Sequence, residues 1–106
     1  MSYLMGIDNG GTFVKAGIID EKGNIIAVAR QPIQNLTPKP GYTERDMGKL
    51  WEQNAKVIRD SLEKSGIDSE DLSGISFSGH GKGLYLVGKD GKPSYPGILS
   101  TDARAW

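Results

Sequence analysis

The chain has 106 residues, 37% hydrophobic and 25% charged, and its 13 basic and 13 acidic side chains give a formal net charge of zero. This composition is typical of one small globular domain, and the charge balance argues against a basic nucleic-acid face or a patch for anionic membranes. The absence of cysteine excludes disulfides and thiolate chemistry. No signal peptide is visible, and no run approaches the ~20 apolar residues of a membrane span, so we expect a cytoplasmic protein.

The first third of the sequence predicts three antiparallel strands. Apolar runs favour strands over residues 3–8, 13–20 and 25–30, the last extending a little further. Tight turns separate them, and the second turn, residues 20–24, is expected to hold Gly or Asn at positive φ. Alternation in the second strand places three apolar residues on one face: Val14, Ala16 and Ile18.

The turn between the first two strands carries a candidate phosphate and metal site. Gly10 and Gly11 are expected to adopt positive φ and to let backbone N–H groups approach an anion without a Cβ in the way. Thr12 adds a hydroxyl donor, and Lys15 adds a cation that also suits a surface position. Asp8 ends the first strand and suits Mg²⁺, which prefers carboxylate oxygen and keeps most of its waters. A plain hairpin turn with a solvated Asp8 is the alternative.

A loop and an amphipathic helix follow. Residues 34–42 hold two prolines and a glycine without periodicity, which predicts a loop. Asp46 ends the capping pattern Thr-Glu-Arg-Asp and is a candidate N-cap, while Glu44 is expected to fix the loop rather than to act as a catalyst. Gly66 predicts the helix end. Spacing of three and four residues defines the apolar stripe: Met47, Leu50, Trp51, Ala55, Ile58 and Leu62. We therefore expect Trp51 in the core.

The rest of the chain alternates short strands with glycine-rich turns. After a connector over residues 67–72, residues 73–78 predict a fourth strand, whose position after a helix favours parallel pairing. A glycine-rich turn at residues 79–83 precedes a predicted fifth strand over residues 84–87. A further turn and two prolines then lead to an Ile-Leu pair and to the polar tail, residues 100–104.

Together these features resemble a known fold. Asp-Asn-Gly-Gly-Thr at residues 8–12 resembles the first phosphate motif of the superfamily that includes sugar kinases, hexokinases, actin and the heat-shock ATPases. The order of three strands, a helix and another strand is similar to the front half of a ribonuclease H-like domain of the actin and hexokinase type, an α/β fold with a mixed sheet. The resemblance implies that residues 1–106 form the incomplete N-terminal portion of such a domain in a longer chain.

Three further segments are similar to the FGGY-type carbohydrate kinases. Gly-Tyr-Thr-Glu-Arg-Asp at residues 41–46, with Trp51 downstream, resembles the aromatic-x-Glu-x-Asp pattern that leads into their first helix. Residues 79–83 resemble their substrate-contacting turn, and residues 98–104 resemble a segment that lines their sugar pocket. Within the family, the Gly-Lys-Gly-Leu run and the polar tail look most like L-xylulose kinases and their polyol kinase relatives.

The resemblance implies ATP-dependent phosphorylation of a sugar or polyol hydroxyl, with a ketopentose such as L-xylulose favoured and with ATP and Mg²⁺ as cofactors. The residues implied at the transferring phosphate and its metal are Asp8, Gly10, Gly11, Thr12 and Lys15, with Asp8 reaching Mg²⁺ through water. Those implied at the sugar hydroxyls are His80, Lys82 and Asp102. The expected partner is a small sugar or polyol, and neither a nucleic acid nor a membrane; the sequence leaves a homo-oligomer open.

Departures from the family pattern narrow this prediction. Many members carry Gln-Met-His-Gly at the substrate turn, where this chain has Gly-His-Gly-Lys at residues 79–82, so D-xylulose is disfavoured. Glycerol is disfavoured too, because the Arg-Glu pair of glycerol kinases is missing. The family's catalytic base and adenosine pocket have no match and are expected beyond Trp106, so residues 1–106 alone are expected to be inactive.

Three other functions are compatible with parts of the sequence. A sugar kinase of the repressor-and-kinase group also favours Asp-x-Gly-Gly-Thr, but it lacks the pattern at residues 41–46. An actin- or chaperone-like module would bind nucleotide without sugar chemistry, and an orphan domain would bind a sugar without turnover. At single positions, His80 and Lys82 also suit a solvated loop, and Asp102 also suits a helix N-cap.

Overall fold

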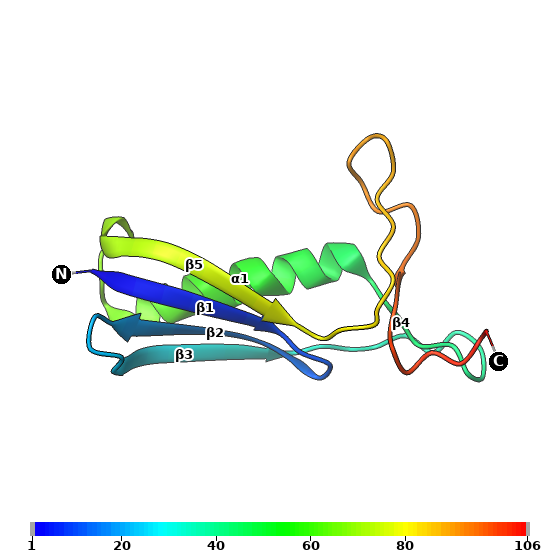
Figure 1. The fold of residues 1–106 in the computed structure, drawn as a ribbon, viewed down its shortest axis with the longest axis horizontal. Coiled ribbons are helices and arrows are strands. Elements are labelled where there is room, and N and C mark those ends of the chain that lie inside the picture. The colour runs from blue at the N-terminus through cyan, green and yellow to red at the C-terminus, as the bar shows by residue number, and fades with distance from the viewer. Residues whose placement is uncertain (1, 106) are drawn as a thin grey trace.

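One mixed sheet forms the centre of this α/β fold (Figure 1). A computed structural model describes residues 2–105. The sheet contains β1 (Tyr3–Asn9), β2 (Phe13–Asp20), β3 (Ile25–Pro32) and β5 (Leu72–Gly79), in the order β3-β2-β1-β5. β2 is antiparallel to both β1 and β3, whereas β5 is parallel to β1. The predicted antiparallel meander and the parallel fourth strand are therefore confirmed.

The connection from β3 to β5 contains α1 (Met47–Ser65) and a short 3-10 helix, η1 (Ser69–Asp71). The Asp46 side chain accepts a hydrogen bond from the Lys49 N–H at 3.0 Å, and Gly66 ends α1 at φ 68°. Both predicted helix ends are therefore confirmed. Glycine suits the end of α1 because the residue after a helix often takes the left-handed conformation. None of the helices in the described part of the chain combines the length and the apolar character needed to cross a membrane.

The hydrophobic core lies between α1 and one face of the sheet. α1 packs mainly on β2 and β3, and only lightly on β1. The core residues, which include the three predicted from the alternation of β2, are Met5, Ile7, Val14, Ala16, Ile18, Ala29 and Val57. On the opposite face Leu4 and Val28 are each 48% exposed. The two faces of the sheet therefore differ: one is sealed by α1, and the other is open.

The predicted core position of Trp51 is wrong. Trp51 is 71% exposed, whereas Asn54, Val57 and Ser61 form the buried row of α1. With about 100° of turn per residue, Trp51 lies roughly 90° around the helix from the centre of that row. α1 packs mainly on β2 and β3, and the flank that carries Trp51 stays open to solvent.

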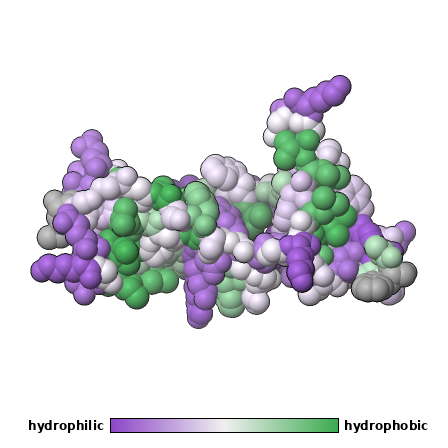
Figure 2. All heavy atoms as spheres, viewed as in Figure 1, coloured by the Kyte–Doolittle hydropathy of each residue, from purple (hydrophilic) through white to green (hydrophobic). Residues whose placement is uncertain are grey.

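The predicted fifth strand, residues 84–87, is also wrong. Its segment makes isolated bridges instead, such as that of Leu84 with Ile98. Nearby glycines and prolines interrupt the ladder, because proline donates no backbone hydrogen bond. Residues 83–96 form an arm that projects from the rest of the chain (Figure 1), with hydrophobic side chains below a charged tip (Figure 2).

A short strand pair organises the end of the molecule that lies beyond the sheet. β4 (Glu44–Arg45) is antiparallel to β6 (Gly97–Ile98). Two-residue strands leave no periodic signal, and the sequence did not predict them. The molecule is elongated, 51 × 28 × 19 Å, with the sheet and α1 at one end and this pair at the other (Figure 1). The pair brings the polar tail beside residues 41–44, just before α1 in the sequence.

Ile18→Ala tests the core. Ile18 is 0% exposed between the sheet and α1, and truncation leaves a cavity, so we expect the free energy of unfolding to fall by about 2–5 kcal/mol. Ile25→Ala is the matched control, because Ile25 is 71% exposed and its truncation is expected to cost less than about 0.5 kcal/mol. Urea unfolding followed by circular dichroism measures both. Equal losses would contradict this placement of the core.

Candidate functional site

Asp8 lies near the end of β1 on the sheet face that α1 leaves open. The Ser78 hydroxyl, at the same level of β5, donates to Asp8 Oδ1 at 3.3 Å. Lys15 stands directly opposite Asp8 in the β1–β2 ladder and so shares this face. A cavity of about 360 Å³ is lined by Asp8 and Lys15 together with Ser76 and Ser78. Two residues predicted at the phosphate and its metal therefore reach one cavity.

The turn after β1 leaves two backbone donors free. The Gly10 N–H closes the turn by donating to the Phe13 carbonyl at 3.0 Å, but in the described part of the chain the Gly11 and Thr12 N–H groups meet no backbone acceptor. The predicted positive φ at Gly10 and Gly11 is wrong, since neither residue has one. The reason for glycine at position 10 is steric instead, because a Cβ there would lie 3.1 Å from the Phe13 carbonyl oxygen.

His80 follows β5 and is tied to β1, because its N–H donates to the Asn9 carbonyl at 3.0 Å. Its Nε2 lies 2.6 Å from the Tyr85 hydroxyl. The Tyr85 ring occupies space that Gly83 and Gly97 leave open, and a Cβ at Gly97 would overlap the ring. Tyr85 is thus held in place by the backbone around it, and it sets the direction of the imidazole.

Lys82 adopts a strained backbone conformation within the predicted substrate turn. Its φ is 62°, the one positive φ outside glycine in the described part of the chain. The left-handed region costs an L-residue about 1–2 kcal/mol, and such strain concentrates at binding and catalytic turns. Its side chain is exposed. The turn itself follows β5 as the sequence predicts.

An ion-pair cluster holds the polar tail against β4. Arg104 donates to Glu44 Oε2 at 2.7 Å and to the two Asp102 oxygens at 2.7 and 2.8 Å. The Thr43 N–H donates to Asp102 as well, at 2.6 Å. The Arg104 side chain, helped by the Arg104 and Thr43 N–H groups, holds the pKa of the Asp102 carboxyl well below its usual range. Glu44 is buried and also accepts a hydrogen bond from the Tyr95 hydroxyl, at 3.2 Å; that it fixes the loop rather than acting as a catalyst stays a prediction.

A second cavity, of about 240 Å³, joins the phosphate turn to the segments predicted to bind sugar. We call it the shared cavity. Its lining residues are Gly11, Thr12, Asn35, Arg45, His80, Leu99, Ser100 and Thr101. It contains two of the predicted phosphate ligands and one predicted sugar ligand. Hydrogen-bond donors for a phosphate therefore lie beside a ring nitrogen and two hydroxyls that suit a sugar.

Five of the predicted residues lie outside the lining of the shared cavity, and Gly10, in the turn after β1, is one of them. Asp8 and Lys15 line the cavity on the open face of the sheet. Lys82 lines neither cavity, and Asp102 faces Arg104 and Thr43, whereas its neighbours in the polar tail line the shared cavity. The structure thus places the candidates at the ends of β1 and β5, at the start of β2 and in the polar tail, and only five of them line one of these two separate cavities.

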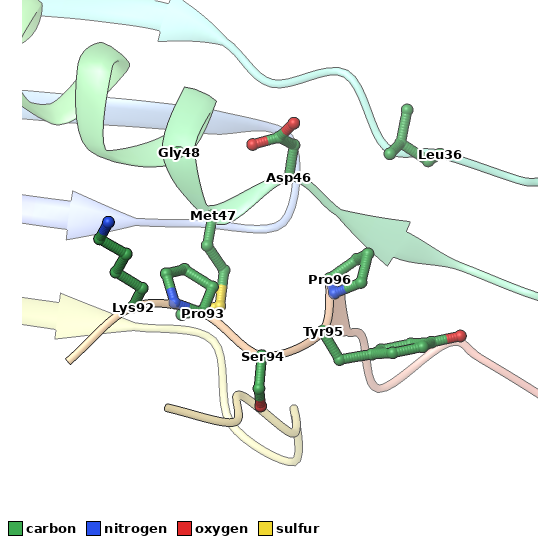
Figure 3. Close-up of a pocket in the computed structure, with 9 residues that line it drawn as sticks. All are labelled: Leu36, Asp46, Met47, Gly48, Lys92, Pro93, Ser94, Tyr95 and Pro96. Atoms are coloured by element: carbon green, nitrogen blue, oxygen red, sulfur yellow. The ribbon is translucent and has the colours of Figure 1, made fainter. Parts of the chain in front are cut away.

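A larger cavity, of about 510 Å³, lies between the start of α1 and the base of the arm (Figure 3). Figure 3 shows Asp46, Met47 and Gly48 across from the segment 92–96. None of the residues predicted to bind phosphate or sugar lines this cavity. Its volume alone therefore does not make it the site, and chemistry favours the shared cavity.

The donors at the end of β1 fit a phosphate with Mg²⁺. Free N–H groups of successive residues, with the Thr12 hydroxyl nearby, suit phosphate oxygens. Asp8 offers one carboxylate, and Mg²⁺ is commonly held by one or two carboxylates, substrate phosphates and water. In the described part of the chain, no three His, Cys, Asp or Glu side chains gather into a metal cluster.

Sequence reasoning missed Arg45 and Tyr85. Arg45 is 1% exposed and borders the shared cavity, although charged residues are rarely buried without a partner. The position of the Arg45 side chain depends on the pairing of β4 with β6. A strand of two residues leaves no sequence pattern from which this pairing could be predicted. For Tyr85 a signal existed, because Gly83 and Gly97 leave room for a ring, but only the fold shows which ring occupies it.

Comparison with known proteins assigns the family. Residues 3–106 match the FGGY family of carbohydrate kinases, N-terminal domain. The chain belongs to this family. It is 43% identical over 105 residues to a probable L-xylulose kinase from Pasteurella multocida, covering 99% of this chain and 22% of that protein. It is 46% identical over 103 residues to the L-xylulose/3-keto-L-gulonate kinase of Escherichia coli, covering 97% of this chain and 21% of that protein.

Solved FGGY structures confirm the fold. The crystal structure of xylulose kinase from Rhodospirillum rubrum matches with a TM-score of 0.88 at 25% identity, over 96% of this chain and 21% of that one. The predicted FGGY membership and the actin- and hexokinase-type α/β fold are thus confirmed. The chain spans 21–22% of the length of the FGGY relatives named above. That residues 1–106 are the front part of the N-terminal domain stays a prediction, as do the roles of the single site residues.

Asp102→Asn tests the ion-pair cluster through its pH dependence. Arg104 lowers the pKa of Asp102 in the folded state, so the unfolded state binds the proton more tightly. The resulting stabilisation is present above the unfolded pKa of about 3.9 and is lost as the pH falls through the lower, folded pKa. We expect the variant to be less stable than the wild type at neutral pH, with a difference that narrows below about pH 4.

Urea unfolding of both proteins across this acid range measures the difference. Glu52→Gln is the control, because Glu52 is exposed on α1 and takes no part in the ion-pair cluster; its free energy of unfolding at neutral pH should match that of the wild type within about 0.5 kcal/mol. A stability difference for Asp102→Asn that stays constant in acid would contradict the contribution of the Asp102–Arg104 pair.

Proposed function

We propose that this chain supplies the phosphate-binding and sugar-contacting part of a kinase that uses ATP to phosphorylate a hydroxyl of a sugar or polyol. The observation that carries the proposal is the shared cavity, in which Gly11 and Thr12 lie together with His80. Phosphoryl transfer is mostly positioning plus neutralisation of charge, so donor phosphate and acceptor hydroxyl must meet in one site. The shared cavity suits that requirement, because residues with donors for a phosphate lie beside residues that can hydrogen-bond a sugar.

The phosphate side of the proposed site uses the end of β1. The Gly11 and Thr12 N–H groups would bind the transferring phosphate, and Gly10 keeps the turn tight enough to present them. Asp8 would hold Mg²⁺ through water, and Lys15, opposite it in the ladder, would offset phosphate charge. When bound, Mg²⁺ neutralises charge that develops on the phosphates during transfer.

The sugar side uses the turn after β5 and the polar tail. His80 would offer a sugar hydroxyl the ring nitrogen that Tyr85 does not engage, and Lys82 would approach from the strained position in the same turn. Asp102 would contribute to sugar binding indirectly. Its hydrogen bond with the Thr43 N–H would hold the polar tail in place, so that Ser100 and Thr101 line the cavity. Sites that hydrogen-bond a hydroxyl strongly reject analogues that lack it.

The acceptor hydroxyl must lose a proton, and we place the general base beyond Trp106. In the described part of the chain, no carboxylate lines the shared cavity. We place the adenosine pocket in the same later part of the protein. Residues 1–106 are accordingly proposed to contribute binding groups without turning over on their own.

A ketopentose such as L-xylulose is the proposed substrate. The support is the identity of 43% and 46% to proteins named as a probable L-xylulose kinase and an L-xylulose/3-keto-L-gulonate kinase. The substrate turn, Gly-His-Gly-Lys at residues 79–82, argues against D-xylulose and glycerol on the grounds given above. We propose the cytoplasm as the location of the protein.

ADP release by the full-length protein tests this function. With ATP, Mg²⁺ and a panel of ketopentoses and polyols, we expect sugar-dependent release that is highest with L-xylulose. Asp8→Asn is expected to lower turnover about 10–100-fold and to raise the Mg²⁺ concentration required, because a carboxylate that orients metal-bound water is lost. Glu63→Gln, exposed on α1, is the control. No ADP release with any of these sugars would contradict the function, and an unaffected Asp8→Asn variant would contradict the metal role.

Lys82→Gly separates backbone strain from sugar binding. Glycine adopts the φ of 62° without penalty, so we expect the free energy of unfolding to rise by up to about 1 kcal/mol. Loss of the ammonium is expected to raise the KM for the sugar and to leave the KM for ATP unchanged. Lys89→Gly, at an exposed position of the arm, is the control. A stabilised variant with an unchanged sugar KM would contradict the sugar role of Lys82.

A further inference from the structure

Arg45 is a buried cation without an acidic partner. Its side chain is 1% exposed and is the largest of the fully buried side chains in residues 2–105. The ion pairs within that range involve Lys56 and Arg104. The neighbouring Glu44 binds Arg104 instead. Because burying a charge without a counter-charge is costly, the surroundings of Arg45 must offer hydrogen bonds or a ligand of opposite charge.

The guanidinium of Arg45 binds the phosphate turn. Nη1 donates to the Gly10 carbonyl at 3.2 Å, and Nη2 donates to the Gly11 carbonyl at 3.0 Å. Nε and Nη2 also share the Asn35 Oδ1, at 3.3 and 3.2 Å, and the Asn35 amide donates to the Gly11 carbonyl at 3.5 Å. A planar fork that binds two successive carbonyls is a geometry that a lysine ammonium does not reproduce.

These contacts fix the direction of the free backbone donors. The described part of the chain has no cis peptide bond, and in a trans peptide the C=O of one residue and the N–H of the next point in opposite directions. Carbonyls of Gly10 and Gly11 that face Arg45 therefore aim the N–H groups of Gly11 and Thr12 away from it. These are the two N–H groups that meet no backbone acceptor.

The positive charge of Arg45 also lies close to the turn that carries these N–H groups. Arg45 lines the shared cavity together with Gly11 and Thr12. In a partly buried setting, charge interactions are stronger than in water. An anion bound to the outward N–H groups would thus also meet the field of a cation that no carboxylate of the described chain neutralises.

We propose that Arg45 is a positioning residue for the phosphate-binding turn. It fixes the carbonyls of Gly10 and Gly11, aims the N–H groups of Gly11 and Thr12 at a nucleotide phosphate, and contributes the positive charge that this phosphate neutralises. The identity of the ligand as a nucleotide rests on the proposed function. The contacts that define the role of Arg45 do not depend on which sugar is phosphorylated.

Arg45→Met in the full-length protein tests the inference, because methionine fills much of the space without charge or donors. We expect kcat/KM for ATP to fall about 100-fold, as for misplaced binding groups, while the KM for the sugar changes less than about twofold. Titration calorimetry with Mg-ATP should show a matching loss of affinity. Arg45→Lys keeps the charge but loses the planar fork, so its affinity for Mg-ATP should lie between those of the wild type and Arg45→Met. Arg59→Met, at an exposed position on α1, is the control and should match the wild type.

The outcomes separate this inference from the proposed function. If the wild type binds Mg-ATP but phosphorylates no sugar, the proposed function fails, and the affinities of the Arg45 variants still decide the inference. If Arg45→Met does not fold by circular dichroism, a loss of ATP affinity in a folded Arg45→Lys supports the role. Wild-type ATP affinity in a folded Arg45→Met or Arg45→Lys, or an equal rise of the ATP and sugar KM values, overturns it.

Discussion

β5 returns from α1 to lie parallel to β1, and this pairing determines which parts of the chain can meet. Parallel neighbours end at the same edge of a sheet, so the turns that follow Asn9 and Gly79 leave the sheet side by side. The hydrogen bond from the His80 N–H to the Asn9 carbonyl fixes them together. The candidate phosphate turn, residues 9–12, and the turn predicted to contact sugar, residues 79–83, are far apart in sequence, and the topology alone makes them neighbours.

The two-residue strand β4 makes the second connection. Successive residues of a strand point to opposite sides, and here each side has a use. Glu44 binds Arg104 and so holds the polar tail. Arg45, on the other side, binds the carbonyls of the phosphate turn. A change in the register of β4 against β6 would therefore disturb both halves of the site at once.

The elements with a periodic signal could be predicted, and those made by distant pairing could not. The strands of the sheet and the caps of α1 follow from apolar alternation, glycine turns and one capping aspartate. Trp51 was misplaced because the buried row of α1 includes the polar Asn54 and Ser61, so hydrophobicity did not mark its centre. Local motifs located the candidate phosphate and sugar turns. Arg45 and Tyr85 escaped because β4 and β6 pair across half the chain.

Gly83 and Gly97 leave room for the Tyr85 ring, and a Cβ at either position would crowd it. The Tyr85 hydroxyl in turn orients His80. For protein engineers, these positions form one unit. A library that randomises residue 80 alone samples new side chains against an unmoved phenol, which restricts the shapes that the shared cavity can take. Substitutions at 85 and 97 must be combined, since a larger residue at 97 requires a smaller one at 85 before the cavity can change shape.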